Sequence, residues 1–187
     1  MIRRRKKPAQ VYAFIDSQNV NVSTQKHGWK MDWRKLREFL KEKYGVTEAF
    51  MFIGYVPENE EMYKQLHESG YRIVLKPTYD LTRPRPEEGD EKKPIKGNVD
   101  AELVLWAMKE LNHYSKAVIV SGDGDFYCLV EYLVQQKKLL KLLPPSQHYS
   151  GLYNAFDDYV EQLDKFRNDL QYRTFKRKKG QANGKKT

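Results

Sequence analysis

The sequence predicts an α/β fold in which helices cover a parallel sheet of about five strands. Short runs rich in β-branched and aromatic residues alternate with longer segments whose apolar residues recur at helical spacing. This alternation is typical of strand–helix–strand units, which build parallel sheets. The chain has 187 residues, enough for one such domain with a sizeable core and some additional length at the ends.

Five segments have the composition of strands. They are residues 11–15, 46–56, 71–76, 116–120 and 138–143. The first is an unbroken run of apolar and aromatic residues, as expected for a strand that is buried on both faces. Pro77 ends the third strand and Pro144 the fifth, because proline cannot donate a backbone hydrogen bond to a neighbouring strand.

Helices are expected between these strands. They are predicted after Asp32 up to Gly45, over 58–69, after Asn98 up to 111, over 125–136, and once or twice within 152–170. Asp32 and Asn98 are good N-caps, and Gly45 is a good helix end. The stripe predicted to be buried in the helix after Asn98 comprises Ala101, Val104, Leu105, Met108 and Leu111.

Residues 78–97 interrupt the alternation. They contain three prolines and mixed charges but no apolar period, which predicts an exposed loop. Because the loop leads into the acidic segment at 96–100, we expect it to border the functional pocket. The predicted organisation is a basic disordered arm at 1–9, a folded domain at 10–170 and a basic disordered tail at 171–187.

The positive charge lies at the two ends of the chain. The formal net charge is +9, yet residues 1–7 carry five positive charges and residues 171–187 carry seven, with no acid in either segment. The rest of the chain therefore carries −3. Basic tails of this composition often bind polyanions, which favours a nucleic-acid partner, although a purely solubilising role is the alternative.

Several classes of protein are disfavoured by what the chain contains. Cys128 is the single cysteine, so it forms no internal disulfide, and the four histidines are scattered without the spacing of a zinc site. No apolar stretch is long enough for a membrane span, and the basic N-terminus is not followed by the apolar region of a signal peptide. We therefore expect a cytoplasmic protein with no membrane partner.

Four aspartates follow predicted strands. Asp16 ends the first strand in the segment FIDSQN (14–19), Asp100 ends KGNVD (96–100), and Asp123 and Asp125 lie in SGDGDF (121–126). Each has an ordinary structural explanation as a cap or a first-turn acid of a helix. Together they predict one pocket, because the carboxyl ends of parallel strands meet at one edge of the sheet. Carboxylates gathered there favour a hard cation.

Neighbouring residues support that interpretation. Gly122 and Gly124 lack side chains, as expected where a phosphate or a metal approaches the backbone closely. Lys96 supplies a cation that could meet a substrate phosphate, although a solvated loop lysine is the alternative.

The three motifs, in this order, resemble the NYN domain family in its LabA-like branch, within the PIN-like nuclease superfamily. The resemblance covers about residues 10–145. It implies a PIN-like three-layer α/β/α sandwich and a ribonuclease that depends on Mg²⁺ or Mn²⁺. Its acidic positions match Asp16, Asp100, Asp123 and Asp125. Its accompanying polar positions match Asn19 and Ser121.

The predicted function is hydrolysis of RNA phosphodiester bonds, with single-stranded RNA favoured. Asp16 and Asp123 are the candidates for direct metal ligands, while Asp100 and Asp125 complete a second site or orient water. One alternative is an RNA-binding or regulatory protein that keeps the fold with little catalysis. Another is a small-molecule phosphohydrolase, which the basic tails disfavour. The sequence leaves the oligomeric state open, a homodimer included.

Overall fold

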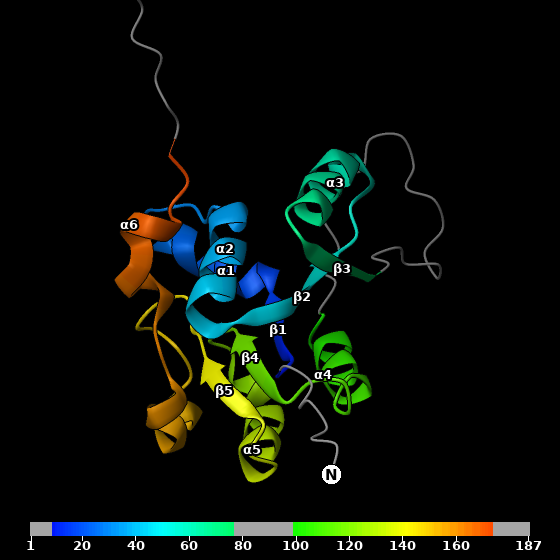
Figure 1. Ribbon diagram of the computed structural model, residues 1–187. Coiled ribbons are helices and arrows are strands. Elements are labelled where there is room, and N and C mark those ends of the chain that lie inside the picture. Colours follow the sequence, from blue (N-terminus) through cyan, green and yellow to red (C-terminus); the bar gives the residue numbers. More distant parts are fainter. Residues whose placement is uncertain (1–8, 77–98, 174–187) are drawn as a thin grey trace, which may run out of the picture.

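A parallel sheet of five strands forms the centre of the protein. The computed structural model describes residues 9–76 and 99–173 (Figure 1). The strands are β1 (Val11–Asp16), β2 (Val46–Gly54), β3 (Tyr71–Lys76), β4 (Lys116–Val120) and β5 (Leu139–Leu142). Their order across the sheet is β3-β2-β1-β4-β5, with every pairing parallel. The predicted α/β fold is confirmed, and β1 and β4 are neighbours in the sheet.

Helices cover both faces of this sheet. The helices are α1 (Ser17–Lys26), α2 (Trp33–Tyr44), α3 (Glu60–Glu68), α4 (Asp100–Lys109), α5 (Tyr127–Gln135) and α6 (Arg167–Leu170). Figure 1 shows α1, α2 and α3 above the sheet and α4 and α5 below it, while α6 packs against α2. Short 3₁₀ turns complete the chain: η1 (Pro57–Asn59), η2 (Gly124–Phe126), η3 (Gly151–Tyr159) and η4 (Leu163–Phe166). The result is a three-layer α/β/α sandwich.

Strand β1 is the central strand and is buried on both faces. Its Ala13 pairs with Ala49 of β2 and Val118 of β4. Alternate β1 residues join two cores: Ala13 and Ile15 pack with α1 and α2, while Phe14 packs on the other side. This two-sided burial explains why β1 appears in the sequence as a continuous apolar run.

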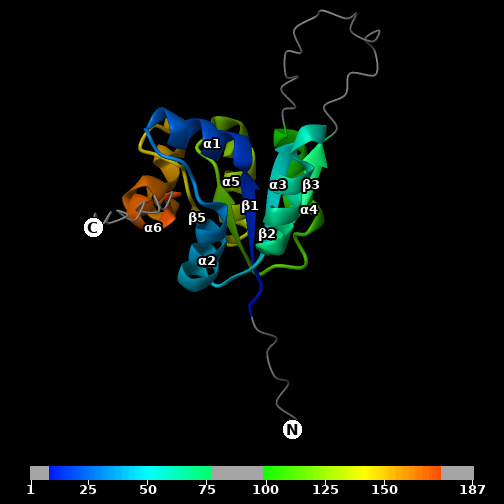
Figure 2. The ribbon, with the colours of Figure 1, turned by 90° about the horizontal axis from the view of Figure 1, so that it is seen from above.

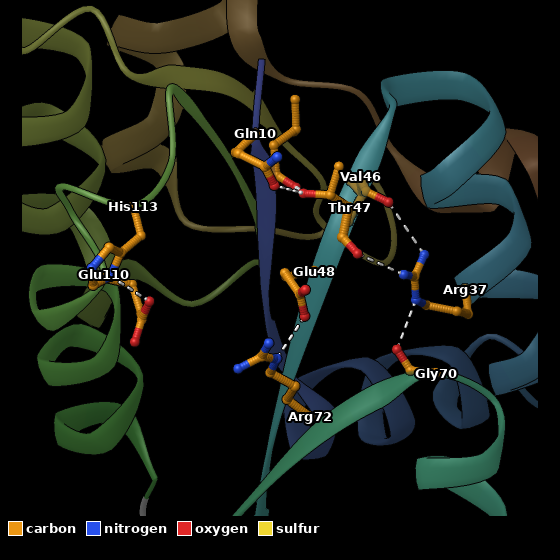
Figure 3. A network of polar contacts seen from close by, with 10 residues as sticks. Gln10, Arg37, Val46, Thr47, Glu48, Gly70, Arg72, Glu110 and His113 are labelled. Carbon is orange, nitrogen blue, oxygen red and sulfur yellow. Dashed lines mark hydrogen bonds and ion pairs between the residues drawn. The ribbon is translucent and has the colours of Figure 1, made fainter. Parts of the chain in front are cut away.

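The amino-terminal edge of the sheet is fastened by Arg37 of α2. Its guanidinium donates hydrogen bonds to the carbonyl oxygens of Gly70 (2.9 Å), Thr47 (3.1 Å) and Val46 (3.4 Å), as Figure 3 shows. These carbonyls lie at the start of β2 and just before the start of β3. A charged donor thus fixes α2 against the sheet at the edge opposite to the one at which α1 begins (Figure 2).

Helix α1 was not predicted. Its sequence, SQNVNVSTQK, buries only Ser17, Val20 and Thr24. The buried residues recur at helical spacing, but two of the three are polar, so the hydropathy of the segment shows almost no helical period. The Ser17 hydroxyl is satisfied by donating to the carbonyl of Phe52 at 2.7 Å.

The predicted buried stripe of α4 is wrong in part. The helix buries Leu103 and Ala107, while Leu105 is 57% exposed and Met108 37% exposed. Apolar residues occupy more than one side of this helix, so periodicity alone did not select the buried side.

Several element boundaries also differ from the predictions. Strand β2 ends at Gly54, two residues early, and the one or two helices expected within 152–170 are mostly 3₁₀ turns, followed by the short helix α6. Gln171 forms a bridge with Met31, and the Tyr172 N–H donates to the carbonyl of Lys30 at 2.8 Å. The first residues of the predicted tail are thus attached to the domain.

Some predictions concern residues outside the described part of the chain. These are the arm over residues 1–8, the loop at 78–97 with Lys96, the cap at Asn98 and the tail from residue 174. Within the described ranges, no helix combines the length and the hydropathy that crossing a membrane requires.

Candidate metal centre

Asp16 lies at the carboxyl end of β1, between two neighbours that hold it. Its Oδ1 accepts the backbone N–H of Asn19 at 3.0 Å, which caps α1, and its Oδ2 accepts the hydroxyl of Ser121 at 3.2 Å. The residue is 4% exposed. Burial raises the pKa of Asp16 to about 6, the nearby carboxylates Asp100 and Asp123 add to the rise, and the two hydrogen bonds oppose it.

The turn after β4 is joined to α1 by side-chain hydrogen bonds. The Oδ1 of Asn19 accepts the backbone N–H of Gly122 at 2.9 Å. Ser121 is fully buried, and its Oγ accepts the N–H of Asp123 at 3.1 Å while its hydroxyl faces Asp16. Asn19 and Ser121 therefore connect the ends of two adjacent strands. This arrangement is typical of the crevice at a topological switch point of a parallel sheet.

The two glycines of this turn make room for protein and not for a ligand. A Cβ on Gly124 would lie 2.5 Å from Oγ of Ser150, and one on Gly122 would lie 3.1 Å from Cβ of Tyr149. The Ser150 N–H also donates to the carbonyl of Gly122 at 3.0 Å. The prediction that a phosphate or a metal approaches these two glycines closely is therefore wrong, because the segment that follows β5 occupies that space.

Asp123 is held at both its side chain and its backbone. Its Oδ1 accepts the N–H of Asp125 at 3.1 Å, which forms the η2 turn, and its carbonyl accepts the hydroxyl of Tyr153. Burial raises the pKa of Tyr153, and the carboxylates of Asp123 and Asp125 add to the rise, so this phenol remains a donor. The second side-chain oxygen of Asp123 takes no part in the turn.

Three carboxylates converge at this edge of the sheet. Asp100, the first residue of α4, joins Asp123 and Asp125, and one oxygen from each lies within 4.8 Å of the others. Asp16 is outside this triple but lines the same pocket. A set of carboxylate oxygens fits Mg²⁺ or Mn²⁺, which prefer oxygen, better than it fits zinc.

The pocket has a volume of about 510 Å³. Its lining residues are Asp16, Gln18, Asn19, Val22, Ser23, Lys26, His27, Val99, Asp100, Asp123, Asp125 and His148. Gln18, Lys26 and His27 were not predicted to line the pocket because α1 was not predicted, and His148 was not predicted because it arrives from the segment after β5. His27 and His148, described above as scattered, lie with Nε2 and Nδ1 only 3.0 Å apart.

Comparison with known proteins assigns the chain to a family. The family model of the NYN domain matches residues 10–170. This chain belongs to the NYN domain family. NYN domains are PIN-like nucleases, which usually use divalent metal ions and act on nucleic acid. The acidic cluster lies within the matched region.

Two individual proteins are similar to this NYN chain. The low amplitude and bright protein LabA of Synechococcus elongatus is 25% identical over 166 residues, which cover 84% of this chain and 86% of LabA. A crystal structure of a Vibrio parahaemolyticus protein of unknown function superimposes with a TM-score of 0.68 at 20% identity, covering 90% of this chain and 99% of that one. At this identity the structural likeness establishes the fold alone.

Proposed function

We propose that this NYN domain is a ribonuclease that depends on Mg²⁺ or Mn²⁺ and hydrolyses phosphodiester bonds of single-stranded RNA. The observation that carries the proposal is the convergence of Asp100, Asp123 and Asp125 on one pocket, beside the buried Asp16. Three carboxylates so close together repel one another, and a bound cation relieves that repulsion.

Asp100, Asp123 and Asp125 would hold the cation. When bound, such a cation neutralises charge on a phosphate and activates water for attack. The chain supplies the positioning: the η2 turn fixes Asp123 relative to Asp125, and the hydroxyl of Tyr153 fixes the backbone of Asp123. Because these contacts form before any substrate arrives, the carboxylates need little rearrangement to act.

Asp16 adds a fourth carboxylate whose protonation is coupled to the cation. With its pKa at about 6, a part of the Asp16 population is protonated near neutral pH in the absence of metal. A cation nearby favours the ionised form, so its binding releases protons. Asn19 and Ser121 hold the side chain in place in either state, through one backbone and one hydroxyl hydrogen bond.

Two features support a nucleic acid as the substrate. The NYN family acts on nucleic acid, and twelve positive charges at the two ends of this chain can attract a polyanion toward a domain that is otherwise net negative.

The test is cleavage of end-labelled single-stranded RNA by the full-length protein with Mg²⁺, Mn²⁺ or EDTA. We expect cleavage with either cation, none with EDTA, and none by Asp123→Asn. The variant Asp158→Asn, which changes an exposed aspartate outside the pocket, is the matched control and should cleave as the wild type does. Cleavage by Asp123→Asn at the wild-type rate would refute the proposal. Metal-dependent binding of RNA without cleavage would instead favour the regulatory alternative.

A further inference from the structure

The acidic pocket continues into a second hollow. This hollow has a volume of about 470 Å³ and shares His27 with the pocket. Its other lining residues are Trp29, Gln147, Gln162, Asp164, Lys165 and Arg167. A surface path, here called the His27 path, therefore leads from the carboxylates across the end of α1 to the start of α6.

Cations line this path. Lys26 lies in the acidic pocket, and Lys165 and Arg167 lie in the second hollow. Within residues 9–76 and 99–173, neither Lys26 nor Lys165 forms an ion pair, while Arg167 donates one hydrogen bond to the carbonyl of Gly28 at 3.0 Å. The path thus offers positive charge directly beside a pocket that is strongly negative.

The histidine pair between the two hollows has a defined arrangement of protons. The Nδ1 of His27 lies 2.7 Å from the carbonyl of Ser23, so this nitrogen carries a hydrogen. In the neutral pair, Nε2 of His27 then accepts the Nδ1–H of His148 at 3.0 Å. Because Nδ1 of His148 faces His27, its Nε2 is the ring nitrogen left to contact a phosphate oxygen, as a donor when it carries the hydrogen.

We propose that the His27 path binds the stretch of single-stranded RNA that flanks the scissile phosphate. Lys165 and Arg167 each contact a phosphate of this stretch. The histidine pair contacts a further phosphate that lies between those two residues and the carboxylates. The inference rests on the proposed nuclease function. An extended polyanion is the occupant that fits both ends of the path, because one part of it must reach the cation site while the next part meets the basic residues. Contacts of this kind position the strand without reading its sequence.

The test is the salt dependence of RNA binding, measured by fluorescence anisotropy with the full-length protein, labelled single-stranded RNA and EDTA. Each phosphate contact contributes about 0.7 to the slope of log affinity against log salt. The double variant Lys165→Gln/Arg167→Gln should therefore reduce the slope by about 1.4. The matched control Lys64→Gln/Lys109→Gln removes the same charge from α3 and α4, outside both hollows, and should leave the slope unchanged.

A second variant tests the histidine pair. His148→Gln should raise the Kd for RNA about 10- to 100-fold, the effect of losing one hydrogen bond to a charged group. His113→Gln is the control, because His113 is also exposed but pairs with Glu110 outside both hollows. A Kd unchanged by His148→Gln would remove the pair from the proposed path.

The outcomes separate this inference from the proposed function. If the double variant and its control have equal slopes while the wild type cleaves RNA, the His27 path is refuted and the nuclease stands. If the salt dependence of RNA binding is weaker in the double variant but not in its control, and the wild type does not cleave RNA, the His27 path is supported and the nuclease function is refuted.

Discussion

Asp16→Asn is expected to stabilise the metal-free protein while removing a carboxylate from the pocket. The pKa of Asp16 rises from 3.8 to about 6 on folding, mainly because the carboxylate is buried. A carboxyl group whose pKa is higher in the folded state ionises more easily in the unfolded chain, so its ionisation lowers the free energy of unfolding. The resulting destabilisation is absent below pH 3.8, grows between pH 3.8 and about 6, and is complete above that range.

The size of the effect follows from the shift. At 1.36 kcal/mol per pKa unit, the change from 3.8 to about 6 corresponds to about 3 kcal/mol. Asparagine keeps the acceptor for the N–H of Asn19 but turns an amide toward Ser121, whose hydroxyl must reorient. Allowing about 1 kcal/mol for that change, the free energy of unfolding should increase by about 2 kcal/mol at pH 8. For a chain of this size the melting temperature should rise by about 4–8 °C.

Thermal unfolding in EDTA, measured from pH 8 down to pH 4 for wild type and Asp16→Asn, checks this expectation. The difference between the two proteins should shrink as the pH falls through 6 and be nearly lost at pH 4. Addition of Mn²⁺ at pH 8 should stabilise the wild type more than the variant, because the variant lacks one of the negative charges that attract the cation to the pocket. A variant that is less stable than the wild type at pH 8, or equally stabilised at every pH, would refute the reasoning.

Three further changes test other parts of the structure. Gly124→Ala should lower the free energy of unfolding by about 1–3 kcal/mol, because the new Cβ would lie 2.5 Å from Ser150 Oγ. The additional change Ser150→Gly should restore most of this loss in denaturant unfolding. Tyr153→Phe should cost about 1 kcal/mol by removing the hydroxyl that donates to the turn after β4, and calorimetric titration should show weaker Mn²⁺ binding. Leu103→Ala should destabilise the protein by about 2–5 kcal/mol because Leu103 is buried, and Leu105→Ala by about 0.5 kcal/mol or less because Leu105 is exposed. Equal effects of the two changes in chemical denaturation would contradict the assigned buried side of α4.

The sheet could be predicted because its strands carry strong local signals. Strands β1 and β4 are buried on both faces, so each appears as an unbroken apolar run, and their shared direction brings Asp16 and Asp123 to one edge. The convergence of acids follows from topology and needs no knowledge of side-chain contacts. That is why this part of the site could be inferred from the sequence.

The features that were missed depend on packing. Helix α1 buries serine and threonine, so its hydropathy has no helical period. The role of Gly124 depends on Ser150, which arrives from a segment beyond β5. The contact between His27 and His148 joins residues 121 positions apart, across a helix that the sequence did not reveal. Local propensity carries no information on such contacts.

The central claim is that the carboxylates of Asp100, Asp123 and Asp125, at the start of α4 and in the turn after β4, hold a divalent cation beside Asp16. Crystals grown or soaked with Mn²⁺ test it directly, because the anomalous signal of the metal locates it without assumptions about activity. We expect one or more peaks within about 2.0–2.6 Å of carboxylate oxygens from Asp100, Asp123 and Asp125, the range for hard cations on oxygen ligands, and no peak there in Asp123→Asn crystals. An empty pocket in the wild type at millimolar Mn²⁺, or the same peak in the variant, would contradict the account.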